Sequence, residues 1–273
     1  MSGLLGYTFF QNALAGALLA SVLCAFVGTY VVTRRLVIAG GGVAHASLGG
    51  VGMGAYFGFS PLAGAAAFAV LSGLAIERMS RSGRVREDSA VAMLWTLGMS
   101  LGILFAYLAP GFMTDLPAYL FGDILSITRT DLWLLAALTL AAAGFMGAWL
   151  PAIVTVAYDR DFARTQGLPV RLIETVMTLL TALSIVACLH VVGIVLVISL
   201  LSIPQTTAGL IVRTFRGTIW LSALLGYAGC LGGLALSYAL DVPSGASIIV
   251  VSVAIYLLVY TIKRLKISFK REA

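Results

Sequence analysis

Long apolar runs, separated by short polar stretches, make up most of the chain. A helix needs roughly 17 to 25 residues to cross about 30 Å of hydrocarbon, and the runs are close to this length. The pattern therefore predicts nine membrane-spanning helices. Their expected bounds are 9–33, 42–59, 61–77, 89–109, 132–150, 172–190, 192–212, 217–240 and 246–262.

The sixth and seventh runs are nearly continuous, because only His190, Val191, Val192 and Gly193 lie between them. A single helix over 172–212 would be about 60 Å long, which is twice the thickness of the hydrocarbon core. We therefore expect the chain to turn or break here. If this stretch formed one span instead of two, the total would be eight.

The composition identifies lipid as the main solvent of the protein. Of the 273 residues, 60% are hydrophobic and only 10% are charged, and the mean hydropathy is +1.04. Soluble domains carry about 25% charged residues, so this class is excluded, as is intrinsic disorder. Cys24, Cys188 and Cys230 all lie in apolar runs and form no close pair, which excludes a small disulfide-stabilised module. We expect an all-α, polytopic integral membrane protein with a single domain over 1–273.

The distribution of basic residues predicts the orientation. The net charge is +6, but Lys and Arg are confined to short stretches between the apolar runs, which is typical of membrane topology and not of nucleic-acid binding. With the amino terminus outside, 16 of the 17 basic residues fall in the cytoplasm and only Arg129 lies outside. The carboxyl terminus is then cytoplasmic. The first eight residues contain no Lys or Arg, so the first run is expected to be a retained span.

Four aspartates fall on the outer side in this topology, against one arginine. They are Asp115, Asp123, Asp131 and Asp241. An acidic outer surface attracts cations or basic protein surfaces, so these residues are candidates for external docking. The alternative is that they only solvate the outer loops.

The sequence contains none of the common catalytic motifs. HExxH, CxxC and GxSxG are absent, and no lysine follows a glycine-rich phosphate-binding loop. A transport function would therefore need a partner protein or an ion gradient as its energy source.

His45 is the most informative residue in the apolar runs. It lies beside Gly42, Ala46, Gly50 and Gly54, which recur every four residues and form a small-residue stripe for close helix packing. The imidazole would be either a hydrogen-bonding strut between helices or a ligand for a transition metal. His190, the other histidine, is expected to be a hydrogen-bonding residue at a helix end.

The stretch 157–171 predicts a short cytoplasmic helix between two spans. Asp159 can cap its start, Gly167 can end it in a left-handed conformation, and Pro169 prevents its continuation. Its exposed face would carry Phe162 and Arg164. Such a helix could dock on a soluble partner, or it could be an ordinary amphipathic connector at the lipid headgroups.

Several segments resemble the permease subunits of ABC importers for zinc, manganese and iron. Residues 40–50 are similar to the family signature Gly-Asp-Ala-Leu-Ser-His-Ala followed by Leu-Pro-Gly, and residues 119–126 are similar to its Gly-Asp-Ile-Leu segment. Residues 162–169 and 192–197, together with 203–208, resemble its longest shared block. The matches run from about residue 30 to 212 in the family's order.

The resemblance implies a homodimer in the bacterial plasma (inner) membrane, with two cytoplasmic ABC ATPase subunits and an external metal-binding protein. The chain itself would not be an enzyme and would hold no permanent cofactor, because its divalent zinc, manganese or iron is cargo. The resemblance also implies that 157–171 is the coupling-helix region. Its expected contacts with the ATPase are Asp161, Phe162, Arg164, Gly167, Leu168 and Pro169.

His45 matches the histidine of the family signature, which implies that it contacts the metal in the transport path. The chain departs from the signature at two positions, since Gly41 replaces its Asp and Gly49 replaces its Pro. A lone imidazole binds a metal less well than an imidazole with a carboxylate. Two-fold symmetry could bring in a second His45.

Two other functional classes are kept as alternatives. An ion-gradient-coupled secondary transporter would need buried carboxylates, and Glu174 is the only acid placed within a predicted span apart from Glu77, the last residue of 61–77. A membrane-embedded enzyme is disfavoured by the missing catalytic groups.

Overall fold

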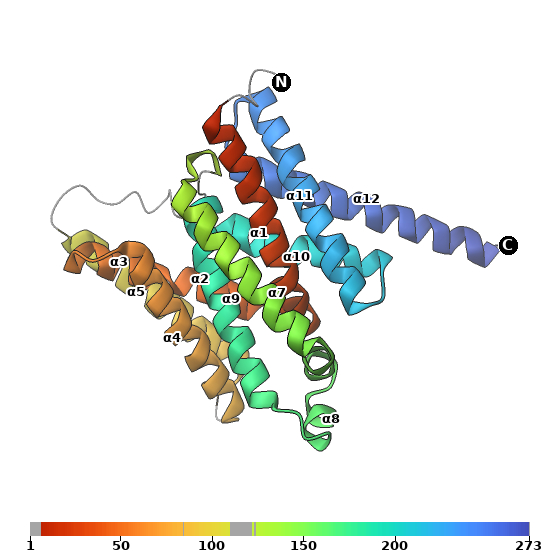
Figure 1. Ribbon diagram of the computed structural model, residues 1–273, viewed down its shortest axis with the longest axis horizontal. Helices are drawn as coiled ribbons and strands as arrows, with labels where there is room; N and C mark the ends of the chain where they lie inside the picture. Colours follow the sequence, from red (N-terminus) through yellow and green to blue (C-terminus); the bar gives the residue numbers. More distant parts are fainter. Residues whose placement is uncertain (1–6, 84, 110–121, 123, 273) are drawn as a thin grey trace.

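The computed structural model describes residues 7–83, 85–109, 122 and 124–272. Within these ranges all regular secondary structure is helical, as predicted (Figure 1). The elements are α1 (Thr8–Thr33), α2 (Val37–Ala46), α3 (Leu48–Phe57), α4 (Pro61–Arg81), α5 (Glu87–Leu108), the 3-10 turn η2 (Ile124–Ser126), α7 (Arg129–Tyr158), α8 (Arg160–Thr165), α9 (Val170–Val192), α10 (Ile194–Ile211), α11 (Phe215–Leu240) and α12 (Ser244–Glu272).

Eight helices of the described chain are long and apolar enough to cross a membrane: α1, α4, α5, α7, α9, α10, α11 and α12. They correspond to eight of the nine predicted runs. The expected break near residue 190 is confirmed, because Gly193 separates α9 from α10 with a φ of 78°. Only glycine adopts this conformation without strain.

The prediction of one continuous helix over 42–59 is wrong. The chain forms two helices of ten residues each, α2 and α3, and the first begins at Val37. At the junction, the Ser47 hydroxyl donates a hydrogen bond of 2.6 Å to the Ala44 carbonyl, so a side chain occupies a backbone acceptor where the helix is interrupted. A ten-residue helix is about 15 Å long, so neither half could cross the hydrocarbon core alone.

The helices form three neighbouring groups (Figure 1). In the centre, α1 packs against α7, and α7 packs against α9. On one side, α3 lies between α4 and α5, while α2 reaches inward to contact α9 and α10. On the other side, α10, α11 and α12 pack against one another, and α10 and α11 also cover α1.

The Gln205 side chain, next to a proline inside α10, joins α10 to α1. Pro204 lies inside α10 and has no N–H to donate to the Leu200 carbonyl. The Gln205 Nε2 group donates to that carbonyl over 2.9 Å and to the Cys24 carbonyl of α1 over 2.7 Å. One amide group therefore repairs the bond lost at the proline and ties the two helices together.

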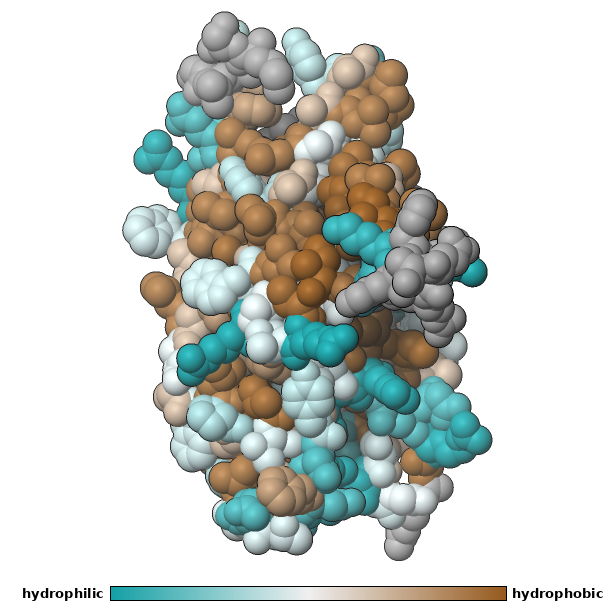
Figure 2. All heavy atoms as spheres, turned by 90° about the vertical axis from the view of Figure 1, so that its right-hand side faces the viewer, coloured by the Kyte–Doolittle hydropathy of each residue, from teal (hydrophilic) through white to brown (hydrophobic). Residues whose placement is uncertain are grey.

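Large apolar side chains on several helices face outward, as expected of a surface in contact with lipid. Figure 2 shows one such face, on which hydrophobic side chains cover much of the upper and central part and hydrophilic ones gather toward the lower part. Exposed examples on α11 and α12 are Trp220, Leu224, Val250, Leu257 and Leu258. The membrane-protein class predicted from the composition is thereby confirmed.

The small-residue stripe brings helix backbones into direct contact, as predicted. An added Cβ atom at Gly50 would overlap the Gly64 carbonyl of α4, and one at Gly42 would overlap the Val91 side chain of α5. At Gly54 it would lie 2.7 Å from the Pro61 Cα atom. These positions therefore have no space for a larger side chain.

We predict that Gly50→Ala lowers the stability of the protein. Because the obstacle is the Gly64 backbone, the helices must move apart, at a cost of about 1–3 kcal/mol or more. The thermal midpoint in detergent should fall. Gly144→Ala on α7 is the matched control, because no heavy atom lies within 4 Å of its added Cβ atom. Equal midpoints for the two variants would contradict the close α3–α4 contact.

Candidate functional site

His45 lies near the end of α2, half-buried, with its ring against α5. The imidazole stacks on the indole of Trp95, with ring centroids 4.5 Å apart and planes inclined by 8°. On α5 itself, the Trp95 Nε1 group donates to the Met99 sulfur over 2.9 Å. Stacking and this hydrogen bond together fix the orientation of the imidazole.

The Nδ1 atom of His45 is buried and has no hydrogen-bond partner in the described part of the chain. Leaving a buried polar atom unsatisfied costs about 1–3 kcal/mol. The structure thus gives no support at this atom for a strut between helices, since α2 meets α5 here through ring stacking. A ligand could use this nitrogen only after the side chains around it move apart.

One chain does not supply a complete metal site within the ranges that the structure describes. No group of three or more His, Cys, Asp or Glu side chains lies close enough together to hold an ion there. Gly41 lies one helical turn before His45, and an added Cβ atom would meet the Ile198 side chain at an ordinary 3.6 Å. The position therefore has room for the first atom of a larger side chain.

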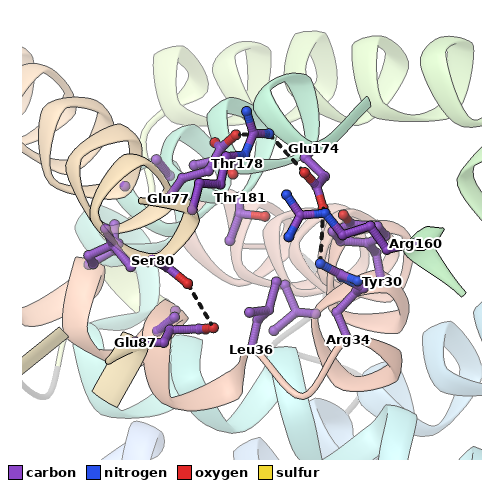
Figure 3. Close-up of a pocket in the computed structure, with 18 residues that line it drawn as sticks. Tyr30, Arg34, Leu36, Glu77, Ser80, Glu87, Arg160, Glu174, Thr178 and Thr181 are labelled. Carbon is purple, nitrogen blue, oxygen red and sulfur yellow. Dashed lines mark hydrogen bonds and ion pairs between the residues drawn. The ribbon is translucent and has the colours of Figure 1, made fainter. Parts of the chain in front are cut away.

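A cavity of about 130 Å³ lies beside α2, toward its amino-terminal end. Gly40 and Val43 of α2 and Gly73 of α4 form part of its wall. Tyr30 of α1 and Thr178 of α9 also line it (Figure 3). The cavity thus adjoins the helix that carries His45.

The same cavity is lined by three arginines and three glutamates: Arg34, Arg81, Arg160, Glu77, Glu87 and Glu174. Figure 3 shows the Glu174 side chain reaching toward those of Arg34 and Arg160. The topology predicted that the three arginines lie on one side of the membrane, and the structure does bring them together. That this side is the cytoplasm stays a prediction.

The predicted helix in 157–171 is present as the six-residue α8. The Asp159 carboxylate caps it by accepting hydrogen bonds from the Asp161 and Phe162 amides over 3.1 and 2.9 Å. Gly167 ends the turn with a φ of 71°, and Pro169 precedes α9. The predicted capping and termination are confirmed.

The expected ATPase-contact residues of this region differ in exposure. Phe162 is 52% exposed, although its neighbour Ala163 is fully buried. Asp161 and Arg164 are exposed and form an ion pair of 3.1 Å. Leu168 packs against the hydrophobic core. The exposed Phe162 side chain could contact a partner protein.

The four aspartates predicted for docking fall into three cases. Asp241 is exposed and takes a left-handed conformation that ends α11. Asp131 is only 7% exposed, and its carboxylate accepts hydrogen bonds from the Thr128 amide and hydroxyl at the start of α7. Because this carboxylate is committed to capping, Asp131 is not included in the docking surface proposed below. Asp115 and Asp123 lie outside the described residues.

Two features of the site were missed in the sequence. Trp95 belongs to an apolar run, and nothing in its local pattern indicates that it meets a histidine 50 positions earlier. Glu174 was noted only as an acid in a span. Its position near a span end, with three basic stretches predicted on the same side, was the signal that could have indicated ion pairing.

Comparison with known proteins decides the family. Residues 6–263 match the ABC 3 transport family. The chain belongs to this family. The ABC 3 assignment covers nearly the whole described chain, so α2 with His45, the cavity and α8 all lie within the family's domain.

Two relatives of this ABC 3 protein are similar over almost their full length. An uncharacterised membrane protein of Synechocystis is 38% identical over 260 residues, covering 95% of this chain and 92% of the relative. The manganese transport system membrane protein MntC of Halalkalibacterium halodurans is 34% identical over 257 residues, covering 94% and 88%. The fold is similar to that of PsaBC from Streptococcus pneumoniae, solved with a Fab, with a TM-score of 0.85, 26% identity and coverage of 95% and 93%.

We predict that Asp159→Ala loosens the start of α8. Loss of an N-cap acceptor costs about 0.5–2 kcal/mol, which corresponds to amide exchange roughly 2- to 30-fold faster. Hydrogen exchange of the Asp161 and Phe162 amides measures this directly. Asp159→Asn keeps an acceptor oxygen and should exchange nearly as slowly as the natural protein. Equal exchange in the Ala and Asn variants would contradict the capping role.

Proposed function

We propose that this ABC 3 family protein is the membrane permease of an ATP-driven importer for a divalent transition metal. The observation that carries the proposal is the buried, unpartnered Nδ1 atom of His45. It lies on a broken helix beside a cavity, in a chain whose relatives include manganese transport proteins. Manganese is the first candidate cargo, and zinc and iron are the others.

A homodimer would complement the incomplete metal site. Each chain offers one oriented imidazole, and a two-fold axis near α2 would bring a second His45 to the same ion. Neutral imidazole binds late first-row metals better than magnesium or calcium. The absence of a carboxylate at position 41 makes this site weaker than one with an Asp, which favours release of the ion.

Two separate ABC ATPase subunits would supply the energy. The sequence has no nucleotide-binding loop, and α8 presents Phe162 to solvent between the charged side chains of Asp161 and Arg164. An aromatic anchor within a charged rim is typical of a protein interface. Gly167, Leu168 and Pro169 would hold this helix at a fixed angle to α9.

An external metal-binding protein would deliver the cargo. Asp241 is exposed at the end of α11, and its charge would attract a basic surface on that protein. We assign the same role to Asp115 and Asp123.

We predict that His45→Ala reduces manganese uptake at least about tenfold in proteoliposomes containing the whole transporter, because the ion loses its only imidazole ligand on each chain. Basal ATP hydrolysis should persist. Gly41→Asp should tighten manganese binding, and Gly41→Asn is the matched control of similar size without the charge.

If His45→Ala took up manganese, zinc and iron as fast as the natural protein, His45 would have a packing role and would not be a metal ligand. If Gly41→Asp and Gly41→Asn bound manganese equally, the ion would not pass within reach of position 41.

We predict that Phe162→Ala separates ATP hydrolysis from transport. Removing an exposed aromatic anchor from an interface costs about 2 kcal/mol or more of binding, whereas the fold of the permease does not depend on it. The measurement is the amount of metal transported per ATP hydrolysed, together with the thermal midpoint of the permease. Phe162→Tyr should keep normal coupling. Full coupling in Phe162→Ala would place the ATPase contact elsewhere.

A further inference from the structure

The Glu174 carboxylate is shared by three arginines from three helices. Arg34 directly follows α1, Arg81 is the last residue of α4 and Arg160 is the first residue of α8. The Glu174 Oε1 atom lies 3.0 Å from both Arg34 Nη2 and Arg160 Nε, and its Oε2 atom lies 2.8 Å from Arg81 Nη2. The Glu174 side chain is only 7% exposed, so it is deeply placed among these cations.

The three contacts differ in quality. Arg34 and Arg81 donate directed hydrogen bonds to Glu174. Arg160 lies within ion-pair distance, but its Nε group is not oriented to donate a hydrogen bond. Its side chain is also the most exposed of the three, at 29%. The contact with α8 is therefore the weakest of the three, because charge-assisted hydrogen bonds are stronger than undirected ion contacts.

Further bonds fix the other two arginines. Arg34 also donates to the Val156 carbonyl of α7 over 3.4 Å, and Arg81 forms an ion pair with Glu77 of its own helix. Glu77 in turn accepts a hydrogen bond of 3.0 Å from Thr175 of α9. The ends of α1, α4, α7 and α9 are thus held together without any contribution from α8.

The ion cluster forms one wall of the cavity beside α2. Arg34, Arg81, Arg160 and Glu174 line the same space as Gly40 and Val43 of α2. A displacement of α8 that withdraws Arg160 would therefore change the lining of the cavity that adjoins the helix carrying His45.

We propose that Glu174 is a positioning residue that couples α8 to this cavity. The proposal rests on the function proposed above. In the arrangement seen here, Glu174 holds Arg160 together with Arg34 and Arg81. When the ATPase moves α8, Arg160 leaves, and the carboxylate stays paired with the two hydrogen-bonded arginines. Both arrangements keep Glu174 neutralised, so the cluster can switch between two discrete forms.

The test uses the whole transporter in proteoliposomes, with manganese(II) as the probe. Two quantities are measured: manganese transported per ATP hydrolysed, and the thermal midpoint of the complex. Arg160→Gln should lower the transport ratio about tenfold, within the range of coupling between sites, with an unchanged midpoint. Arg160→Lys keeps the charge and should keep the ratio, because the contact lacks hydrogen-bond geometry. Arg86→Gln, which removes an exposed ion pair with Asp88, is the matched control.

A double-mutant cycle separates coupling from simple stabilisation. If Arg160 acts through Glu174, then adding Glu174→Gln to Arg160→Gln should lower the ratio no further than Glu174→Gln alone. Additive losses would overturn the proposal, as would a normal ratio in Arg160→Gln or equal losses in Arg160→Lys and Arg160→Gln. If Glu174→Gln does not assemble, the two Arg160 variants decide the question.

A natural complex that moves no manganese, zinc or iron overturns the proposed function itself, whereas an active natural complex with an unaffected Arg160→Gln overturns only the coupling role.

Discussion

Close backbone contact of α2 and α3 with their neighbours determines where His45 lies. In lipid, helices gain little from hiding apolar surface, so they associate through tight van der Waals packing of small residues. Gly50 lies against Gly64 of α4, and the Ala46 carbonyl lies against Gly98 of α5. Because His45 directly precedes Ala46, the contact with Gly98 also sets the imidazole against Trp95, three residues earlier on α5.

The lipid surroundings also explain why the charged side chains within the bundle are paired. An isolated carboxylate at this depth would be costly, and Glu174 is neutralised by cations from three helices. This arrangement also bears on the mechanism. A carboxylate already engaged by three arginines has little capacity left to bind a coupling cation such as sodium. This disfavours the ion-gradient-coupled alternative and agrees with energy supplied by a partner protein through α8.

The sequence predicted those features that depend on length and local chemistry. The break at Gly193 followed from hydrocarbon thickness, and the ends of α8 followed from Asp159 and Gly167. The interruption at Ser47 was missed because the flanking residues are apolar throughout, so hydropathy does not distinguish one helix from two. The Trp95 stack and the partners of Glu174 depend on contacts between distant helices, which no local pattern contains.

The position of α3 between α4 and α5 has a consequence for biogenesis. Both neighbours follow α3 in the chain, so its contacts with α4 cannot form until that helix has been synthesised, and its contacts with α5 form later still. Each half of the broken segment is too short to be held by the hydrocarbon core alone. Because His45 stacks on Trp95 of α5, its imidazole reaches this position only after α5 has been made, which is a late event in the assembly of this half of the molecule.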